Sequence, residues 1–249
     1  MKKLIGMFLG FSLVLSACKK DEASGDGVGN FQLRLYPTFE GQAFETGEIY
    51  RDVLGHRIRV DDFKLYISNA ALLKTDGTTL PLIDIDLFTL QTAQSIKFEV
   101  PAGDYAGLLV SFGVPEESNK DQDPTQYPND HPLSVAGAQG MFWGWNTGYI
   151  FMKFEGKADT LGVDGNEMLH PFAFHCGEDV LYRSHDFNVP FNVGDDGTSC
   201  MDLRFAVDRF FYSASDTIDI KVNYLTHTSG NLPLAVRFTD LFNAAVSFE

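Results

Sequence analysis

The chain reads Gly140-Met-Phe-Trp-Gly-Trp-Asn-Thr-Gly-Tyr-Ile-Phe-Met-Lys-Phe-Glu-Gly156 at its most aromatic stretch, which holds both of its tryptophans. The second half of this stretch alternates between two sets of residues. Ile150, Met152 and Phe154 form one set, and Tyr149, Phe151, Lys153 and Glu155 form the other. A period of two is typical of a half-buried β-strand. The stretch therefore predicts a strand at the centre of the fold.

The first half of the stretch is also expected to be extended. Trp143 and Trp145 are two positions apart, so in an extended backbone they share a face. Gly144 between them leaves the opposite face open to another backbone or a ligand, and Gly148 permits a bulge before the strand. The tryptophans are therefore either core residues, as large aromatic residues in strands commonly are, or part of a binding site.

The flanking sequence indicates an all-β fold. Residues 56–74 alternate between apolar and polar side chains, and the alternation shifts by one residue at Asp61 and Asp62. This pattern predicts one long bent strand, or two strands, with a bulge or turn at the shift. Residues 95–100 and 105–114 read as a hairpin, and 217–225 as the last strand. About ten short strands with turns between them predict an antiparallel β-sandwich.

Two segments depart from this strand pattern. Residues 115–139 are rich in Asp, Asn, Pro and Gln and lack periodicity, so we expect a long acidic loop that leads directly into the tryptophan stretch. Residues 232–248 space their apolar residues as one face of a helix, which predicts a single C-terminal helix.

The N-terminus has the form of a lipoprotein signal peptide. Met1-Lys-Lys3 precedes an apolar run at 4–15, and Leu15-Ser-Ala-Cys18 follows as a lipobox. The run is too short to span a bilayer permanently. We therefore expect a signal peptide at 1–17, an acylated Cys18, a flexible tether at 18–30 and one β-sandwich domain at 31–249. Lys19-Lys-Asp-Glu22 resembles surface-export signals of Bacteroidetes-type lipoproteins, which predicts an outer-membrane lipoprotein that faces the periplasm or the cell surface.

The charge of the chain favours cations as partners. Cleavage removes Lys2 and Lys3 and takes the formal net charge from −15 to −17. Nucleic acid and anionic lipid are therefore poor partners for the folded domain, so we expect no nucleic-acid binding and contact with the membrane through the N-terminal lipid anchor.

Two cysteines remain after Cys18. In an oxidising exported compartment, the simplest prediction for Cys176 and Cys200 is a disulfide. The alternative is a metal pair of Cys176 with His175, although adjacent strand positions point to opposite faces.

No motif of a catalytic site occurs in the chain. The six histidines form no HExxH pattern, and neither a phosphate-binding glycine loop nor a G-x-S-x-G elbow is present. We therefore expect a protein that is not an enzyme. Asn119, Asp121 and Asp123 alternate as oxygen donors and make calcium a candidate ligand of the loop, but the spacing lacks the EF-hand glycine and glutamate.

Four separated segments resemble one known family. They are the tryptophan stretch, Asp62-Phe-Lys-Leu-Tyr-Ile-Ser-Asn69, Phe174-His-Cys-Gly177 and Thr226-His-Thr-Ser229. Together they are similar to the MbnP-like family of periplasmic and surface copper-binding proteins. The resemblance spans roughly residues 31–248.

The resemblance implies copper held by imidazole together with kynurenine, an oxidised tryptophan whose aryl amine can bind metal. Carried over to this chain, it implies His175 and either Trp143 or Trp145 as ligands, and a di-haem peroxidase-like partner that oxidises the tryptophan. Pro37 stands where the family often has a further histidine. Binding is then expected to be weak, absent, or re-routed to His131 or His170, and His227 is a further candidate.

Other functions remain open at this stage. A lipid-anchored β-sandwich with exposed tryptophans also fits a binding module for an organic ligand such as a glycan. A third possibility is an interaction protein in which the tryptophans are core residues.

The lipobox generates a direct prediction. Cys18→Ser removes the thiol that would carry the lipid, so the variant is expected in the soluble fraction. The measurement is cell fractionation followed by immunoblotting. A variant that stays wholly with the membrane would contradict the lipoprotein assignment.

Overall fold

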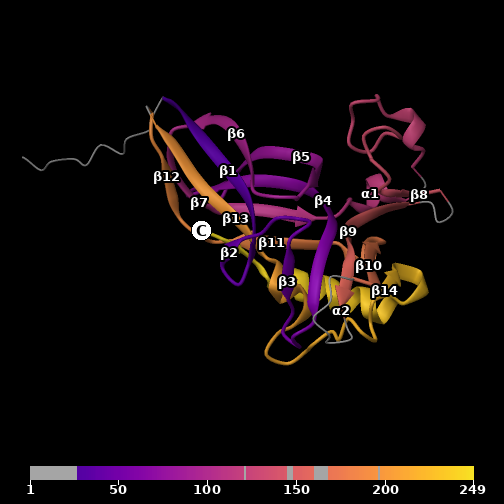
Figure 1. Cartoon of the computed structure of the whole chain (residues 1–249). Coiled ribbons are helices and arrows are strands. Elements are labelled where there is room, and N and C mark those ends of the chain that lie inside the picture. The colour runs from indigo at the N-terminus through magenta and orange to yellow at the C-terminus, as the bar shows by residue number, and fades with distance from the viewer. Residues whose placement is uncertain (1–26, 121, 145–147, 160–167, 196) are drawn as a thin grey trace, which may run out of the picture.

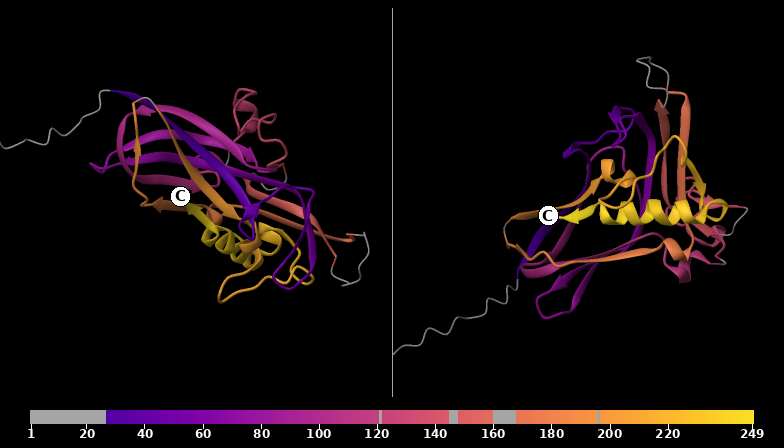
Figure 2. Two further views of the ribbon diagram at one scale, coloured as in Figure 1. Left: turned by 60° about the vertical axis from the view of Figure 1, so that its left-hand side comes forward. Right: turned by 90° about the horizontal axis from the view of Figure 1, so that it is seen from below.

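A computed structural model describes residues 27–120, 122–144, 148–159, 168–195 and 197–249. These residues form two β-sheets, with one long helix lying along the open side between them (Figures 1 and 2). The predicted all-β sandwich is confirmed. None of the helices in the described part of the chain has the length and apolarity that crossing a bilayer requires.

The first sheet has five strands. They are β1 (Val28–Phe39), β2 (Gln42–Ala43), β6 (Gln94–Pro101), β13 (Thr198–Ala206) and β15 (Val246–Phe248). β1 pairs with β13 in parallel, so the sheet is mixed and not wholly antiparallel. Because β1 begins at Val28, the last residues assigned to the tether, 28–30, are part of the sheet.

The second sheet has ten strands. They are β3 (Ile49–Arg51), β4 (Arg57–Lys74), β5 (Thr79–Thr89), β7 (Gly103–Phe112), β8 (Phe142–Trp143), β9 (Gly148–Asp159), β10 (His170–Gly177), β11 (Arg183–Phe187), β12 (Phe191–Val193) and β14 (Leu225–His227). The 18-residue β4 is one long strand, with an irregularity between Val60 and Asp62 against β9. The predicted bulge is therefore confirmed.

Short helices connect the strands. They are α1 (Glu116–Asn119), η1 (Pro124–Gln126), η2 (Asp179–Leu181), η3 (Val207–Phe211) and η4 (Thr228–Gly230), and the longer α2 (Leu232–Ala244) precedes β15. The predicted C-terminal helix is present, but it ends at Ala244 and the chain returns to the first sheet. The side chain of Asn231 caps its N-terminus by accepting from the Leu234 amide.

Two local predictions were wrong. β6 and β7 do not form a hairpin, because β6 pairs with β1 in the first sheet and β7 with β4 in the second. The turn after Pro101 carries the chain from one sheet to the other, and alternation alone does not say which sheet a strand joins. Residues 217–225 are mostly irregular, and Ile218 and Ile220 are buried without belonging to a named strand.

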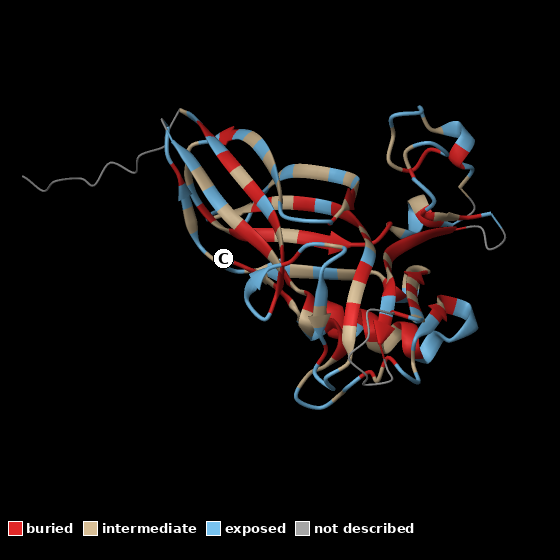
Figure 3. Cartoon of the chain, viewed as in Figure 1, coloured by how far each residue is buried: buried red, intermediate tan, exposed pale blue. Residues whose placement is uncertain are grey.

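The main core lies between the sheets and α2, as the buried residues in Figure 3 show. Phe238 of α2 stacks on Phe174 of the second sheet, with ring centroids 4.1 Å apart. Phe242 of the same helix stacks on Phe205 of the first sheet at 6.2 Å. The helix therefore closes the sandwich by packing aromatic rings against both layers.

The predicted disulfide is wrong, since both cysteines are free. Cys176 is buried in the second sheet, with its Sγ 3.9 Å from the carbonyl oxygen of Ala235 on α2. Cys200 is exposed on β13 of the first sheet. Burial raises the pKa of the Cys176 thiol to about 12, so this group is a neutral core residue.

This difference in burial predicts different thiol reactivity. Iodoacetamide at neutral pH should modify Cys200 in the native protein and Cys176 only after denaturation, because the thiolate is the nucleophile. Peptide mass mapping of protein that has never been reduced is the measurement. A disulfide-linked peptide, or equal labelling of both thiols in the native state, would contradict the structure.

Candidate metal centre

The tryptophan stretch forms β8 and the start of β9, where Trp143 pairs with Gly148. Trp145 lies outside the described residues. A bulge falls at Phe151, since Cys176 pairs with Met152 but Gly177 pairs with Ile150. This bulge shifts the predicted alternation by one residue and turns Ile150 to the face that carries Lys153. The bulge therefore lies within the strand, three residues after Gly148, and not before the strand as expected.

The segment before β8 packs against this strand and is not simply a solvated loop. Tyr66 donates its hydroxyl to the Pro132 carbonyl at 2.8 Å, and Tyr149 donates to the Leu133 carbonyl at 2.5 Å. Burial raises the pKa of both tyrosines, which keeps the hydroxyls protonated as donors. A second, smaller core forms here, made of Tyr66, Val114, Leu133, Ala138, Met141, Trp143, Tyr149, Ile150 and Phe151.

The residues considered for calcium have local partners. Asn119 accepts from the Tyr149 amide at 2.9 Å and donates to Asp179 at 2.8 Å. Asp123 accepts from the amide and the hydroxyl of Thr125. Asp121 lies outside the described residues. These contacts explain Asn119 and Asp123 as structural residues, and nothing in them supports calcium.

Trp143 is buried, with 5% of its surface exposed. Its ring packs directly on Gly177 of β10: a Cβ on this glycine would lie 2.7 Å from a ring atom and 2.4 Å from the Tyr149 carbonyl oxygen. The glycine of the Phe174-His-Cys-Gly177 segment is therefore required so that the indole can approach β10.

Four adjacent strands place a row of side chains across the second sheet. Lys64 on β4 is opposite Lys153 on β9, Lys153 is opposite His175 on β10, and His175 is opposite His227 on β14. The pairing of β10 with β14 is parallel. The register therefore brings together two histidines that lie 52 residues apart in sequence.

The two imidazoles face each other. Their Nδ1 atoms are 2.9 Å apart, and the rings meet edge to face with centroids at 4.6 Å. On its other side, His175 Nε2 lies 2.5 Å from Glu155 Oε1. Hydrogen bonds from His175 and Lys153 lower the pKa of Glu155 to about 2, although burial opposes this shift. Glu155 is therefore a carboxylate at neutral pH.

When both rings are neutral, this network fixes their tautomers. Because the Glu155 carboxylate only accepts, His175 donates Nε2–H to it and keeps a lone pair on Nδ1. His227 then donates its own Nδ1–H to that lone pair. Burial, followed by the nearby His175, lowers the pKa of His227. The lowered pKa favours the neutral form of His227, which is the form of imidazole that binds metal.

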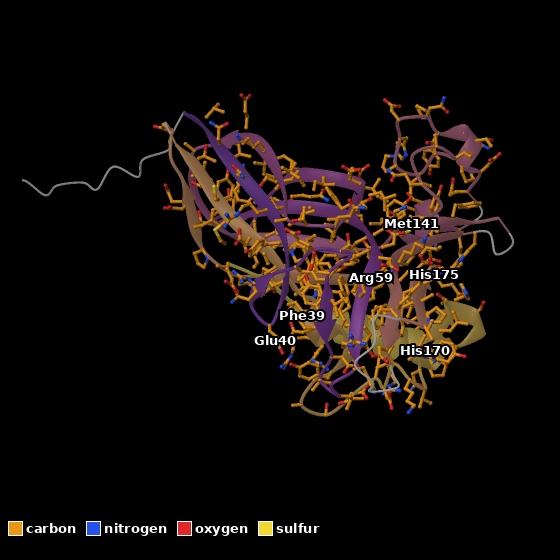
Figure 4. The ribbon with its side chains drawn as sticks, viewed as in Figure 1. Phe39, Glu40, Arg59, Met141, His170 and His175 are labelled. Atoms are coloured by element: carbon orange, nitrogen blue, oxygen red, sulfur yellow. The ribbon has the colours of Figure 1, made fainter. Side chains whose placement is uncertain are left out.

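A cavity of about 420 Å³ opens beside the pair. Its lining consists of Gly140, Trp143, Ile150, Lys153, His175 and His227. Figure 4 shows His175 on β10 with Met141 in the segment above it. The structure thus brings the predicted residues His175 and Trp143 to one cavity and adds His227, which the sequence had ranked lower.

The two histidines predicted as alternative ligands, His131 and His170, have other partners. His131 stacks on Tyr127 at 4.4 Å, and its Nδ1 accepts from the Leu133 amide. His170 Nε2 lies 3.1 Å from the Ile220 carbonyl. Neither lines the cavity, so the re-routing predicted for His131 or His170 finds no support. Pro37 lies in β1 of the first sheet and also does not line it.

In the part of the chain that the structure describes, no group of three His, Cys, Asp or Glu side chains is arranged to hold a metal ion. The two imidazoles are therefore a pair of donors. A metal ion bound by them would need further ligands or a low coordination number.

The family model for MbnP matches residues 28–230. The chain belongs to the MbnP family. Among solved structures, MbnP from Methylosinus trichosporium matches with 16% sequence identity and a TM-score of 0.49, and the match covers 77% of this chain and 80% of that one. No curated protein sequence matches. The resemblance predicted from the sequence is confirmed by the family match.

The contact between Trp143 and Gly177 is directly testable in this MbnP-family protein. Gly177→Ala forces the indole or β10 to shift, so the free energy of unfolding should fall by about 1–3 kcal/mol. Gly230→Ala is the matched control, because a Cβ there meets no atom within 4 Å. Denaturant unfolding followed by tryptophan fluorescence provides the measurement. Equal stability of the two variants would contradict the close packing.

Proposed function

We propose that this MbnP-family protein is an exported copper-binding lipoprotein that captures or buffers copper and is not an enzyme. The observation that carries the proposal is the imidazole pair of His175 and His227, with Nδ1 atoms 2.9 Å apart at the edge of a cavity. The family membership supports copper as the metal, and the lipobox at Cys18 supports an outer-membrane location.

The donor set fits copper. Imidazole is a suitable ligand for copper, and Cu(I) accepts few ligands. Glu155 on the Nε2–H of His175 is the arrangement that orients metal-binding histidines in proteins. Two metal–nitrogen bonds of about 2 Å each need a wider separation than the hydrogen-bonded pair has. Copper bound to both Nδ1 atoms would therefore require the His227 proton to move from Nδ1 to Nε2 and the rings to separate.

The short edge strand that carries His227 is the natural place for such a movement. β14 has three residues and ends at His227, and the next residue, Thr228, has a φ of 53°. The Thr228 hydroxyl donates to the His175 carbonyl and accepts from the Gly177 amide, both at 2.9 Å. This tie keeps His227 beside His175 while the rest of the edge is bound to a single neighbouring strand.

Trp143 is the candidate for a further ligand after oxidation. An indole nitrogen is a poor donor because its lone pair belongs to the ring, whereas kynurenine has an aryl amine. Two equivalents of hydrogen peroxide would each give one oxygen atom to the indole and leave as water, which cleaves the C2–C3 bond and forms N-formylkynurenine. Hydrolysis would then release formate and leave kynurenine. We assign this step to a di-haem peroxidase-like partner. Trp143 or Trp145 remains the target.

The alternative of a glycan-binding module is less well supported. The cavity volume lies in the range of small-molecule sites. Trp143, however, is 5% exposed, so its ring face is packed against protein and does not form a platform for a sugar. Imidazoles facing one another are a better match to a metal ion.

The metal proposal is tested by copper titration with protein purified from its native host. His175→Ala and His227→Ala should each weaken Cu(I) affinity at least about tenfold, since each removes one donor. His170→Ala is the matched control on the same strand, because its imidazole bonds to the Ile220 carbonyl instead. The readout is competition with a chromophoric Cu(I) chelator. If all three variants bind as the parent does, the site lies elsewhere.

The intact mass of the same preparations tests the ligand derived from tryptophan. Conversion of one tryptophan to kynurenine adds about 4 Da. Trp143→Phe and Trp145→Phe, measured separately, identify the modified position, because the mass gain should disappear in one of them. An unmodified parent mass would remove kynurenine from the proposal and leave the imidazole pair.

A further inference from the structure

The charged residues around the imidazole pair form a compact network centred on Lys153. Its Nζ lies 3.1 Å from Glu155 Oε2 and 3.1 Å from Asp62 Oδ2. We propose that Lys153 determines which metal ions the site accepts. By holding both carboxylates, it leaves only the two imidazoles for the metal and so excludes divalent ions that need anionic oxygen ligands. This inference rests on the copper site proposed above.

Both oxygens of Glu155 are engaged. Oε1 accepts from His175 Nε2 at 2.5 Å, and Oε2 accepts from Lys153. The carboxylate can therefore orient His175 without turning toward a metal ion. Lys153 also lines the cavity together with His175 and His227, so its ammonium lies close to where a metal ion would enter.

Asp62 is the second carboxylate near the site. It lies on β4 directly opposite Glu155 on β9, in the row next to that of the histidines. Besides Lys153, its Oδ2 has Lys64 Nζ at 3.9 Å. Lys64 also donates to the Gln139 carbonyl at 3.1 Å. Asp62 is therefore paired with both lysines, and Lys153 connects it to Glu155.

The charges of this network cancel. Lys64 and Lys153 balance Asp62 and Glu155, and imidazole binds a metal ion in its neutral form. A cation that enters the cavity therefore gains no net attraction from its immediate surroundings. Ions such as Zn²⁺, which bind carboxylates as well as imidazole, lose part of their ligand set here, whereas Cu(I) needs only soft or imidazole donors.

Partial burial strengthens the interactions among the charges of this network. The side chain of Lys153 is 22% exposed and that of His175 is 12% exposed. Charges in such positions are screened much less than those on an open surface. Removal of the ammonium would leave two carboxylates beside the imidazole pair, and these are the ligands that Zn²⁺ adds to histidine in proteins.

The test compares Lys153→Met with Lys157→Met in the full chain from the native host. Lys157 is exposed four residues along the same strand and face, so its removal makes the same change in net charge. Zn²⁺ alone and Cu(I) alone are each titrated against a competing chelator. Zn²⁺ affinity should rise at least about tenfold in Lys153→Met and stay at the parent value in Lys157→Met.

Further variants identify the cause. Lys153→Arg keeps the positive charge and should keep the parent's selectivity, whereas Lys153→Gln should gain Zn²⁺ affinity, as Lys153→Met does. Adding Glu155→Gln to Lys153→Met should remove much of the gain, because it removes a released carboxylate. Cu(I) affinity should change less than about threefold in Lys153→Met, since the imidazoles are unchanged.

The outcomes separate the two claims. If the parent binds Cu(I) but Lys153→Met and Lys153→Gln gain no Zn²⁺ affinity over Lys157→Met, the role of Lys153 is overturned and the copper site stands. If the parent binds no Cu(I), the proposed function fails and this inference fails with it.

Discussion

The hydrogen-bonded register from β4 through β9 and β10 to β14 is the constraint on which both the core and the candidate site depend. Side chains of a strand alternate between two faces, so this register sends Phe154 and Phe174 into the core and Lys153 and His175 to the opposite face. A slip of one residue would exchange the two sets. The packing of phenylalanines between the sheets and α2 therefore also fixes the position of the imidazoles.

The bulge at Phe151 joins this regular sheet to the tryptophan stretch. Before the bulge, the strand contributes to the second core under the segment that precedes β8, and after it the strand contributes to the main core. Because the bulge turns Ile150 toward Lys153, the cavity gains an apolar wall beside its charged residues. One extra residue thus places Trp143 and the histidine row at the same opening.

The sequence predicted those parts of the fold that depend on local pattern. The bent strand β4, the alternation of β9 after its bulge and the start of the C-terminal helix follow from periodicity. The pairing of strands and of cysteines was predicted less well. The sequence did not reveal that β6 joins β1, or that Cys176 and Cys200 belong to different sheets, because alternation records burial and not the neighbouring strand.

The candidate site shows the same limit. His175 and Trp143 were identified through a family resemblance, whereas His227 ranked no higher than His131, since nothing local distinguishes one lone histidine from another. The parallel pairing of β10 with β14 separates them by placing His227 against His175. Glu155 and Lys153 were expected on one face of their strand, but their role depends on the rows that β4 and β10 add on either side.

The formal charge of −15 suggests at first that the protein attracts cations through its overall field. That field acts mainly at a distance and is screened within about 8 Å at physiological salt. At the cavity, Lys64 and Lys153 offset Asp62 and Glu155, so the long-range attraction does not extend into the site. The acidic surface can raise the rate at which cations arrive, whereas under the proposed function the two imidazoles left as ligands determine which cation stays.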